Sequence, residues 1–548
     1  MKMKFLAFLV LTLVLFKSVI AQQDTTRQPS VTIVSAFKPI LISPTKINFA
    51  ATSLPVDTIK NIKPYNIPSQ NLQYAYQSVS LNPLSLQTGN IEMQPSNGNV
   101  VKAGYGNLKA VFFDAMMCFE NKVPSTLINA YANYYSATGK RENQQYAQFK
   151  MGGTVNYFMD NAEVYGSLGI NANRHLLYGY DNELFSYDKN QVQHYTRAFH
   201  LTAGYRNTTA NKLGLSYNPN LKATFFSLRD TVAENTFVLD VPVKFRINEK
   251  MLFDVSFQAD ITRYKTKNFS NNVSLSNNLT SINPSFSYRH PRFMAKASGA
   301  FVNNNGSSVF LPGLYVEIPL KEKFLTVNGG WENLYIKNTF MNLNAANPYL
   351  LAVDNQLNTL KQEFYAGINT TLGKFIMINA KASVIKYKDF QFFRNDTTAE
   401  TSAQFFKLYS EDNLNHFRLN GDITYKVREQ FSFTGGVTFN AFSGNKQNEK
   451  VWNMLPMEVN ASMVWRPKNK LTLKGEMYLF ASSPYLMRGG ISGSTKGGTD
   501  LSLGGEYKFT KMIGAFVQLN NIFGESYQRW HQYPVFGFNA FGGVVVRF

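Results

Sequence analysis

Long segments of alternating apolar and polar residues recur along this chain, and they constrain its fold more than any other feature. In FVLDVPVKFRI (residues 237–247) every second residue is apolar, and the segments 417–427 and 471–481 follow the same rule. Successive side chains of a strand point to opposite faces of its sheet, so each segment predicts a strand with one apolar face. The charged residues on the other face of these three strands are Asp240, Lys244, Arg246, Arg418, Asp422, Lys426, Lys474 and Glu476.

The last predicted strand indicates that the apolar face contacts membrane lipid. The tail FGFNAFGGVVVRF (residues 536–548) ends on a bare aromatic residue, Phe548, after a continuous apolar face. At about 13 residues it is long enough for a tilted membrane-crossing strand, which needs roughly 9–11. Aromatic residues make up 14% of the chain and charged residues only 16%, against about 25% charged in typical globular proteins. These features predict a transmembrane antiparallel β-barrel, with a secreted β-sandwich protein as the alternative.

The lengths of the connections predict the topology. Ten connections are short and polar, namely Asn121–Ser125, Met159–Ala162, Thr209–Lys212, Ile247–Lys250, Arg289–Arg292, Leu320–Lys323, Leu372–Lys374, Val427–Gln430, Arg466–Lys470 and Phe509–Lys511. Longer stretches lie between most of them, namely Leu177–Gln191, Tyr264–Ser276, Asn338–Leu360, Lys388–Asn413, Phe442–Leu455, Ala481–Thr499 and Ile522–Val535. Outer-membrane barrels have short turns inside and long loops outside. With a first strand at Asn99–Gly106, the pattern predicts about 22 strands, in a range of roughly 18–22.

The amino-terminal region divides into two further parts. In residues 1–21 two lysines, Lys2 and Lys4, precede a short apolar run, and small residues stand before Gln22, which predicts a secretory signal peptide rather than a membrane anchor helix. Residues 22–98 are rich in proline and polar residues, and the barrel is expected from Asn99 to Phe548. We expect the later part of this leader, from about Tyr65 to Gly98, to lie in or across the periplasmic mouth of the barrel.

No catalytic, cofactor or metal site is expected. The chain has six histidines without a metal-helix spacing and a single cysteine, Cys118. The net charge is +20, but the basic residues are dispersed over strand faces and turns, so nucleic-acid binding is not expected. The segment around Leu350, Leu351, Val353 and Leu357 has helical spacing and predicts a short helix, either in an external loop or folded into the lumen. We expect Trp530–Pro534 to mark the membrane interface.

The carboxyl end resembles that of TonB-dependent outer-membrane receptors. The residues that carry the resemblance are Asn521, Phe523, Tyr527, Tyr533, Pro534 and Phe548. The resemblance implies a receptor-type barrel, a sorting signal ending at Phe548, and contacts with membrane lipid and with the barrel assembly machinery. A TonB-like periplasmic partner would pair with a β-prone stretch consisting of Ser30, Val31, Thr32, Ile33, Val34, Ser35 and Ala36. An extended segment without that role is the alternative.

The resemblance and the residues together leave two functions open. One is transport of a solute or nutrient across the outer membrane through a lumen lined by the eight charged residues named above. The other is a structural or assembly barrel that scaffolds other envelope proteins. The short leader departs from the folded plug of the receptor family, and the sequence names no substrate.

Overall fold

The described part of the chain is one closed antiparallel sheet. The structure is a computed structural model, and it describes residues 99–548 except 123–124, 212, 230, 268–271, 322–323, 397–404 and 488–489. The predicted signal peptide, the leader 22–98, its proposed plug segment and the stretch Ser30–Ala36 lie outside these residues. No helix in the described part is long and apolar enough to cross a membrane.

The barrel sheet has 22 strands, which confirms the predicted fold class and strand number. In chain order they are β1 (Val100–Gly106), β2 (Val111–Lys122), β3 (Ser125–Thr138), β4 (Gln145–Phe158), β5 (Ala162–Leu176), β6 (Gln193–Asn207), β7 with β8 (Leu215–Tyr217 and Asn220–Leu228), β9 (Val232–Arg246), β10 (Met251–Thr266), β11 (Ser274–His290), β12 (Phe293–Asn304), β13 (Ser307–Lys321), β14 (Leu325–Ile336), β15 (Thr359–Leu372), β16 (Ile376–Asn395), β17 (Phe406–Val427), β18 (Phe431–Ser443), β19 (Met457–Lys468), β20 (Leu471–Phe480), β23 (Gly498–Lys508), β24 (Ile513–Asn520) and β27 (Asn539–Arg547).

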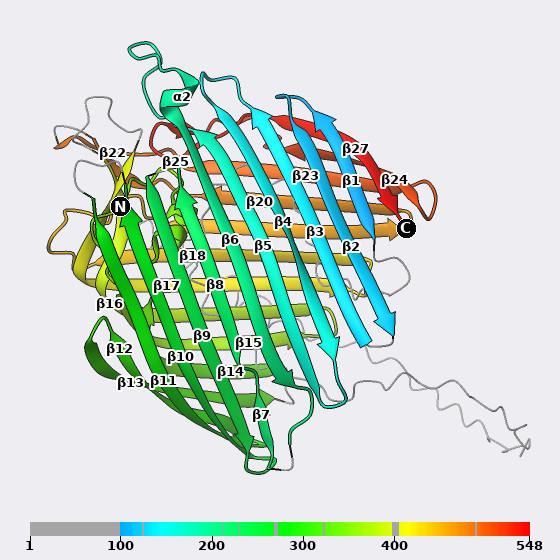
Figure 1. The fold of residues 1–548 in the computed structure, drawn as a ribbon, viewed down its shortest axis with the longest axis vertical. Helices are drawn as coiled ribbons and strands as arrows, with labels where there is room; N and C mark the ends of the chain where they lie inside the picture. The colour runs from blue at the N-terminus through cyan, green and yellow to red at the C-terminus, as the bar shows by residue number, and fades with distance from the viewer. Residues whose placement is uncertain are drawn as a thin grey trace, which may run out of the picture. The chain divides into compact units, whose positions relative to one another are not determined.

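Two details fix this count and the closure. Segments β7 and β8 both pair with β9, so they are one strand interrupted at Asn218 and Pro219. Proline has no N–H to donate to a ladder, which accounts for the break. The first and last strands close the ring, since Val100 is the register partner of Arg547 and Gly106 that of Phe541 (Figure 1).

All ten short turns predicted from the sequence join consecutive barrel strands. Because neighbouring strands are antiparallel, these turns share one end of the barrel with the start of β1 and the end of β27. We call this end the turn end and the opposite one the loop end. The loop end carries the remaining elements: α2 (Lys189–Val192), α3 (Phe340–Ala346), β21 (Pro484–Leu486), β22 (Ser492–Ser494), β25 (Gln528–Trp530) and β26 (Tyr533–Pro534).

Large apolar side chains are exposed on the outside of the strands, as a lipid-facing surface requires. On β9, Phe237 is 43% and Phe245 38% exposed, and on β17 Phe417 is 50% exposed. The polar residues between them lie on the opposite face of the same strands, in the alternation that the sequence predicted. The buried apolar residues gather elsewhere, chiefly at the loop end.

Three expectations need correction. The stretch Lys388–Asn413 is not a loop throughout, because β16 runs to Asn395 and β17 begins at Phe406, 20 and 22 residues long. The predicted helix around Leu350–Leu357 lies earlier, as α3. Trp530 and Tyr533 are only 2% and 3% exposed, so they belong to a packed interior and not to the membrane interface.

Candidate functional site

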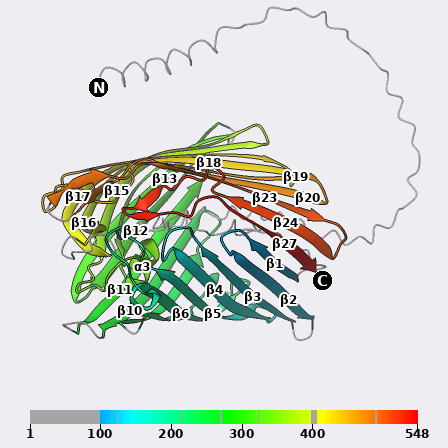
Figure 2. The same ribbon diagram turned by 90° about the horizontal axis from the view of Figure 1, so that it is seen from above.

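The connection between β14 and β15 folds into the barrel instead of standing out from it. We call residues 337–358 the inner loop. Its helix α3 buries Phe340 (0% exposed) and Leu343 (1%), and it lies within the ring of strands (Figure 2). The wall residues that hold it come from β5, β9, β10, β11 and β17. These strands lie on different sides of the ring, so the inner loop spans the lumen at the loop end.

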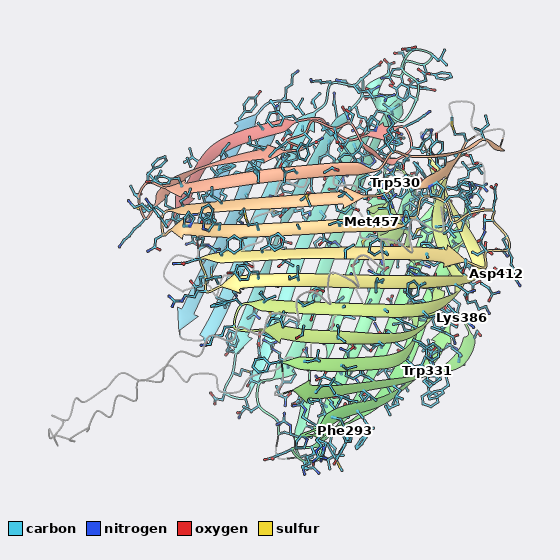
Figure 3. All side chains as sticks on the ribbon, turned by 180° about the vertical axis from the view of Figure 1, so that it is seen from behind. Phe293, Trp331, Lys386, Asp412, Met457 and Trp530 are labelled. Carbon is cyan, nitrogen blue, oxygen red and sulfur yellow. The ribbon has the colours of Figure 1, made fainter. Side chains whose placement is uncertain are left out.

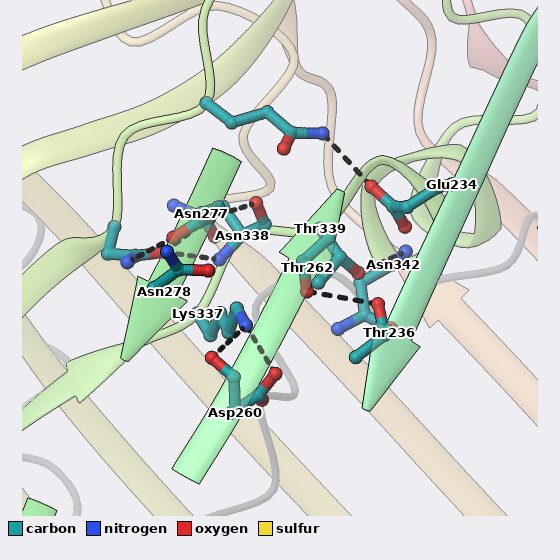
Figure 4. A network of polar contacts seen from close by, with 12 residues as sticks. Glu234, Thr236, Asp260, Thr262, Asn277, Asn278, Lys337, Asn338, Thr339 and Asn342 are labelled. Carbon is teal, nitrogen blue, oxygen red and sulfur yellow. Dashed lines mark hydrogen bonds and ion pairs between the residues drawn. The ribbon is translucent and has the colours of Figure 1, made fainter. Parts of the chain in front are cut away.

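A carboxylate of the wall caps the helix. Glu234 of β9 is 2% exposed, and it accepts hydrogen bonds from the backbone N–H groups of Phe340 (2.6 Å) and Met341 (3.0 Å). Figure 4 shows Glu234 on its strand beside the start of the helix. The side chain of Gln356 donates to the same carboxylate at 3.0 Å. The first N–H groups of a helix lack partners within it, and a negative charge there is favourable. Glu234 therefore stabilises α3 in its inward position.

An ion pair holds the start of the inner loop. The ammonium of Lys337 pairs with the carboxylate of Asp260 on β10 and donates to the backbone carbonyl of Asp260 at 2.9 Å. Both side chains are largely buried, with 9% and 17% of their surface exposed. Burial lowers the pKa of Lys337, while the Asp260 carboxylate opposes that shift. The loop thus leaves β14 through a partly desolvated charge pair with the wall.

An asparagine pair ties the two ends of the inner loop together. Asn277 of β11, fully buried, and Asn358 exchange two amide hydrogen bonds of 2.9 and 2.7 Å. Asn277 also donates to the carbonyl of Asn338 at 3.2 Å, and the N–H of Asn338 donates to the side-chain oxygen of Asn358 at 3.2 Å. One wall residue therefore fixes both the entry and the exit of the loop.

An aromatic core lies beneath these polar contacts. Tyr349 of the inner loop stacks on Tyr533 with ring centroids 3.4 Å apart and an angle of 15°, and Tyr178 packs edge-on against both. Trp530 contacts Phe406 at the start of β17. Burial and the neighbouring tyrosines raise the pKa of the Tyr349 hydroxyl well above its ordinary value. The core joins the inner loop to residues 177–180 and to β25 and β26.

The inner loop also reaches the wall through its backbone. Leu350 forms a parallel bridge with Phe406. The N–H of Leu351 donates to the carbonyl of Phe406 at 2.9 Å, and the N–H of Phe406 donates to the carbonyl of Tyr349 at 3.0 Å. On β10, the hydroxyl of Tyr264 accepts from the N–H of Val353 at 2.9 Å. The inner loop is therefore tied to β10 and β17 by backbone contacts as well.

The charged residues predicted from the sequence do not form one site. They lie on three separate strands, with Asp240, Lys244 and Arg246 on β9, Arg418, Asp422 and Lys426 on β17, and Lys474 and Glu476 on β20. Asp240 accepts from the amide of Asn220 at 3.4 Å, and Asp422 from that of Asn379 at 2.7 Å. All eight lie on the strand face opposite the exposed apolar residues. Their role in lining a solute path stays a prediction.

Other polar groups were missed from the sequence. Glu363 pairs with Lys361 (2.5 Å) and Lys381 (2.7 Å), and Glu506 pairs with Lys102 (3.0 Å) and with Arg547. The alternation marks the inward face of their strands, but no local signal distinguishes Glu234, Asp260 or Glu506 from other inward residues. The described residues contain no group of three or more metal-ligating side chains. Phe548 is 54% exposed, and its N–H donates to Asn99 across the closing pair of strands.

Comparison with solved structures identifies the fold. The siderophore receptor PirA from Acinetobacter baumannii has a TM-score of 0.64 at 10% identity, over 82% of this chain and 80% of that one. The FrpB iron transporter from Neisseria meningitidis has a TM-score of 0.64 at 11% identity, over 82% and 81%. The pyoverdine receptor FpvA from Pseudomonas aeruginosa has a TM-score of 0.61 at 12% identity, over 82% and 78%. Neither protein-family models nor curated proteins match the sequence.

The chain therefore has the barrel fold of TonB-dependent outer-membrane receptors, as the carboxyl-terminal resemblance implied. It is a protein of the outer membrane. The neighbours are receptors and transporters. Because barrels of this class place their short turns in the periplasm, the turn end is periplasmic and the loop end faces outside.

Proposed function

We propose that the protein is a gated transporter of a bulky nutrient across the outer membrane, with the inner loop as its outer gate. The observation that carries the proposal is the cap of α3 by Glu234, which holds the loop inside the barrel by contacts to the wall. A barrel of about 22 strands encloses a lumen that must be filled to prevent leakage, and the inner loop fills it at the loop end.

The chemistry of the attachments supports a gate that opens. The contacts of Glu234, Asp260 and Asn277 with the inner loop are hydrogen bonds and ion pairs. Water can replace such contacts at a modest net cost, about 1 kcal/mol for a neutral hydrogen bond and about 2 kcal/mol for one to a charged group. A solute that binds among the outer loops and competes for the tyrosine core would shift the loop toward an open state. The eight inward charged residues on β9, β17 and β20 would then line the solute path.

The remaining parts of the account concern the periplasmic side. The stretch Ser30–Ala36 would engage a TonB-like partner, and the leader near Tyr65–Gly98 would form the inner barrier. The structural neighbours include a siderophore receptor, an iron transporter and a pyoverdine receptor, so iron complexes of siderophores are the first substrate class to test. We infer a non-catalytic role, since the arrangement offers wall contacts and a gate rather than a nucleophile with its base.

A reversible lock on the gate tests the proposal. Leu350 and Phe406 are bridge partners, a spacing compatible with a disulfide, so L350C/F406C in a C118S background would tie the inner loop to β17. We expect a deletion strain carrying this variant to lose growth on the transported iron complex, and a reductant to restore it. The single variants L350C and F406C control for the substitutions. Uptake that the lock leaves unchanged would contradict the gate and favour a structural barrel that scaffolds other envelope proteins.

A further inference from the structure

The turn end of the barrel carries a ring of exposed cations. Seven turns there are described completely. Six of them each hold one cation between their strands, namely Lys250, Arg292, Lys374, Arg428, Lys470 and Lys511, and the seventh holds Asp160 instead. The same six turns contain only two carboxylates, Glu249 and Glu429. We call these six cations the turn-end girdle. Because these cations recur in most of the turns at this end, the positive charge is a property of the whole rim.

No carboxylate of the described residues forms an ion pair with the girdle. The ion pairs of the described residues involve other basic side chains, such as Lys102, Lys337 and Arg547, and none of the six. Those pairs lie inside the barrel, where desolvation makes a partner necessary. The girdle side chains are exposed, so their charge is directed at whatever surrounds the rim.

Exposed apolar side chains stand directly beside the girdle. Phe375 (45% exposed) follows Lys374, and Met512 (56%) follows Lys511. Phe293 (37%) follows Arg292, and it lies at the turn end of the sheet (Figure 3). Aromatic and apolar residues at the rim of a barrel sit in the membrane interface. A cation next to such a residue is therefore at the depth of the lipid headgroups.

The loop end lacks this excess. Its connection 177–192 holds Asp181, Glu183 and Asp188 with Lys189, all exposed, and its connection 444–456 holds Glu449 with Lys446 and Lys450. Over all described loop-end connections the exposed charged residues are eight basic ones, Lys109, Lys140, Lys189, Arg229, Lys267, Lys446, Lys450 and Lys496, and seven acidic ones, Glu142, Asp181, Glu183, Asp188, Asp354, Glu449 and Glu525, which is close to balance. The charge asymmetry thus separates the two membrane leaflets and is not a general consequence of the basic composition.

We propose that the turn-end girdle binds the phosphates of anionic phospholipids in the inner leaflet of the outer membrane. Lys and Arg near an anionic membrane surface attract its lipids, and each contributes about a fivefold preference. The adjoining apolar side chains favour lipid over a soluble acidic protein, because they place the charges beside acyl chains. The inference rests on the topology and the charge distribution, and it holds whether or not the inner loop is a gate.

The test compares two variants with the same change in net charge. The turn-end variant is K250Q/K374Q/K470Q/K511Q, and the loop-end control is K140Q/K189Q/K446Q/K496Q, all at exposed lysines. The full chain would be purified with an equimolar mixture of phosphatidylglycerol and phosphatidylethanolamine, and the lipids retained would be counted by native mass spectrometry. We expect the wild type and the control to retain phosphatidylglycerol preferentially, and the turn-end variant to lose at least about fivefold of that preference.

Two results would overturn the proposal. One is an unchanged lipid preference in a turn-end variant whose folding is shown by heat-modifiable gel migration, which would leave an acidic periplasmic protein as the partner of the rim. The other is an equal loss in both variants, which would show a non-local effect of net charge. If the turn-end variant does not fold, the wild-type preference measured at rising salt decides the question, since screening must reduce it.

Discussion

The two ends of the barrel are built on different principles. At the turn end, short connections join neighbouring strands and carry exposed cations, without a core of their own. At the loop end, residues 177–180, the inner loop, β25 and β26 share one aromatic core, and wall carboxylates hold loop backbone. The difference teaches that tertiary contacts between segments far apart in sequence hold the loop end together. The following predictions test this contrast.

Removing the inner loop should have the largest effect. Ile336 and Thr359 are register partners, so an Asn-Gly turn can join β14 to β15 in place of residues 337–358. With the leader segment Tyr65–Met93 deleted as well, we expect the conductance of the barrel in planar bilayers to rise at least about a hundredfold, as an aqueous channel replaces a filled lumen.

The leader decides how this experiment is arranged. The loop replacement should be measured with and without deletion of Tyr65–Met93, because the leader is the proposed inner barrier. If deleting the leader alone raises the conductance while the inner loop is intact, the inner loop does not close the lumen.

Removing the charge of Glu234 should increase local opening of the inner loop and leave the loop around residues 446–448 unchanged. In E234Q the helix N-terminus loses its carboxylate, which costs about 2 kcal/mol for hydrogen bonds to a charged group, or about a thirtyfold change in local opening. Hydrogen exchange of residues 340–346 should quicken accordingly.

Glu411 supplies the matched control. It is 1% exposed on β17 and accepts from the N–H groups of Gln447 (3.0 Å) and Asn448 (3.2 Å) in a different loop. E411Q should quicken exchange around residues 446–448 and leave residues 340–346 unchanged. Equal effects of both variants on α3 would mean that the loop end unfolds as one unit.

The stacking of Tyr349 on Tyr533 should give a smaller effect, a coupling free energy between the two side chains. We expect a double-mutant cycle of Y349L and Y533L to give a coupling of about 1 kcal/mol, the usual value for an aromatic pair. Thermal unfolding of the purified barrel measures it. A coupling near zero would indicate that Tyr349 and Tyr533 are buried independently, and that the core does not join the inner loop to β26.

A change of pH should have the smallest effect. His531 stacks on Tyr485 at 3.6 Å, and burial lowers its pKa to about 4. Its ordinary pKa is about 6.5. As the pH falls from 7.5 to 6, the detached state takes up a proton and the stacked state does not, so the contact weakens.

Hydrogen exchange of residues 484–487 should therefore quicken about fourfold at pH 6 relative to the intrinsic rate. In H531F the stack remains without a titrating group, and the ratio should not change with pH. A pH response that persists in H531F would assign it to another residue.

The wall of the barrel could be predicted from sequence because its information is local. Alternation sets which side chains face lipid, and short polar turns at Ile247–Lys250 or Phe509–Lys511 set where strands end. The pattern failed where strands leave the membrane. Phe390, Gln391 and Phe392 of β16 are all buried. Loops cover both faces of the strand there, so apolar and polar residues need not alternate.

The closure could not be predicted because its contacts are distant in the chain. Glu234 and Phe340 are 106 positions apart, and the bonds form only after the barrel has brought β9 opposite the inner loop. Trp530 and Tyr533 have the composition of an interfacial belt, and only the packing of Phe406 and Tyr349 against them shows their place. Local chemistry is the same in both settings, so sequence alone does not separate them.

The position of the inner loop in living cells is the central claim, and thiol labelling tests it most directly. In a C118S background, L343C lies at a site that is 1% exposed within the barrel, while K189C lies on the exposed helix α2. We predict that a membrane-impermeant maleimide labels K189C rapidly and L343C slowly, and that adding E234Q speeds the labelling of L343C. Labelling of L343C as fast as that of K189C, with Glu234 intact, would contradict the account.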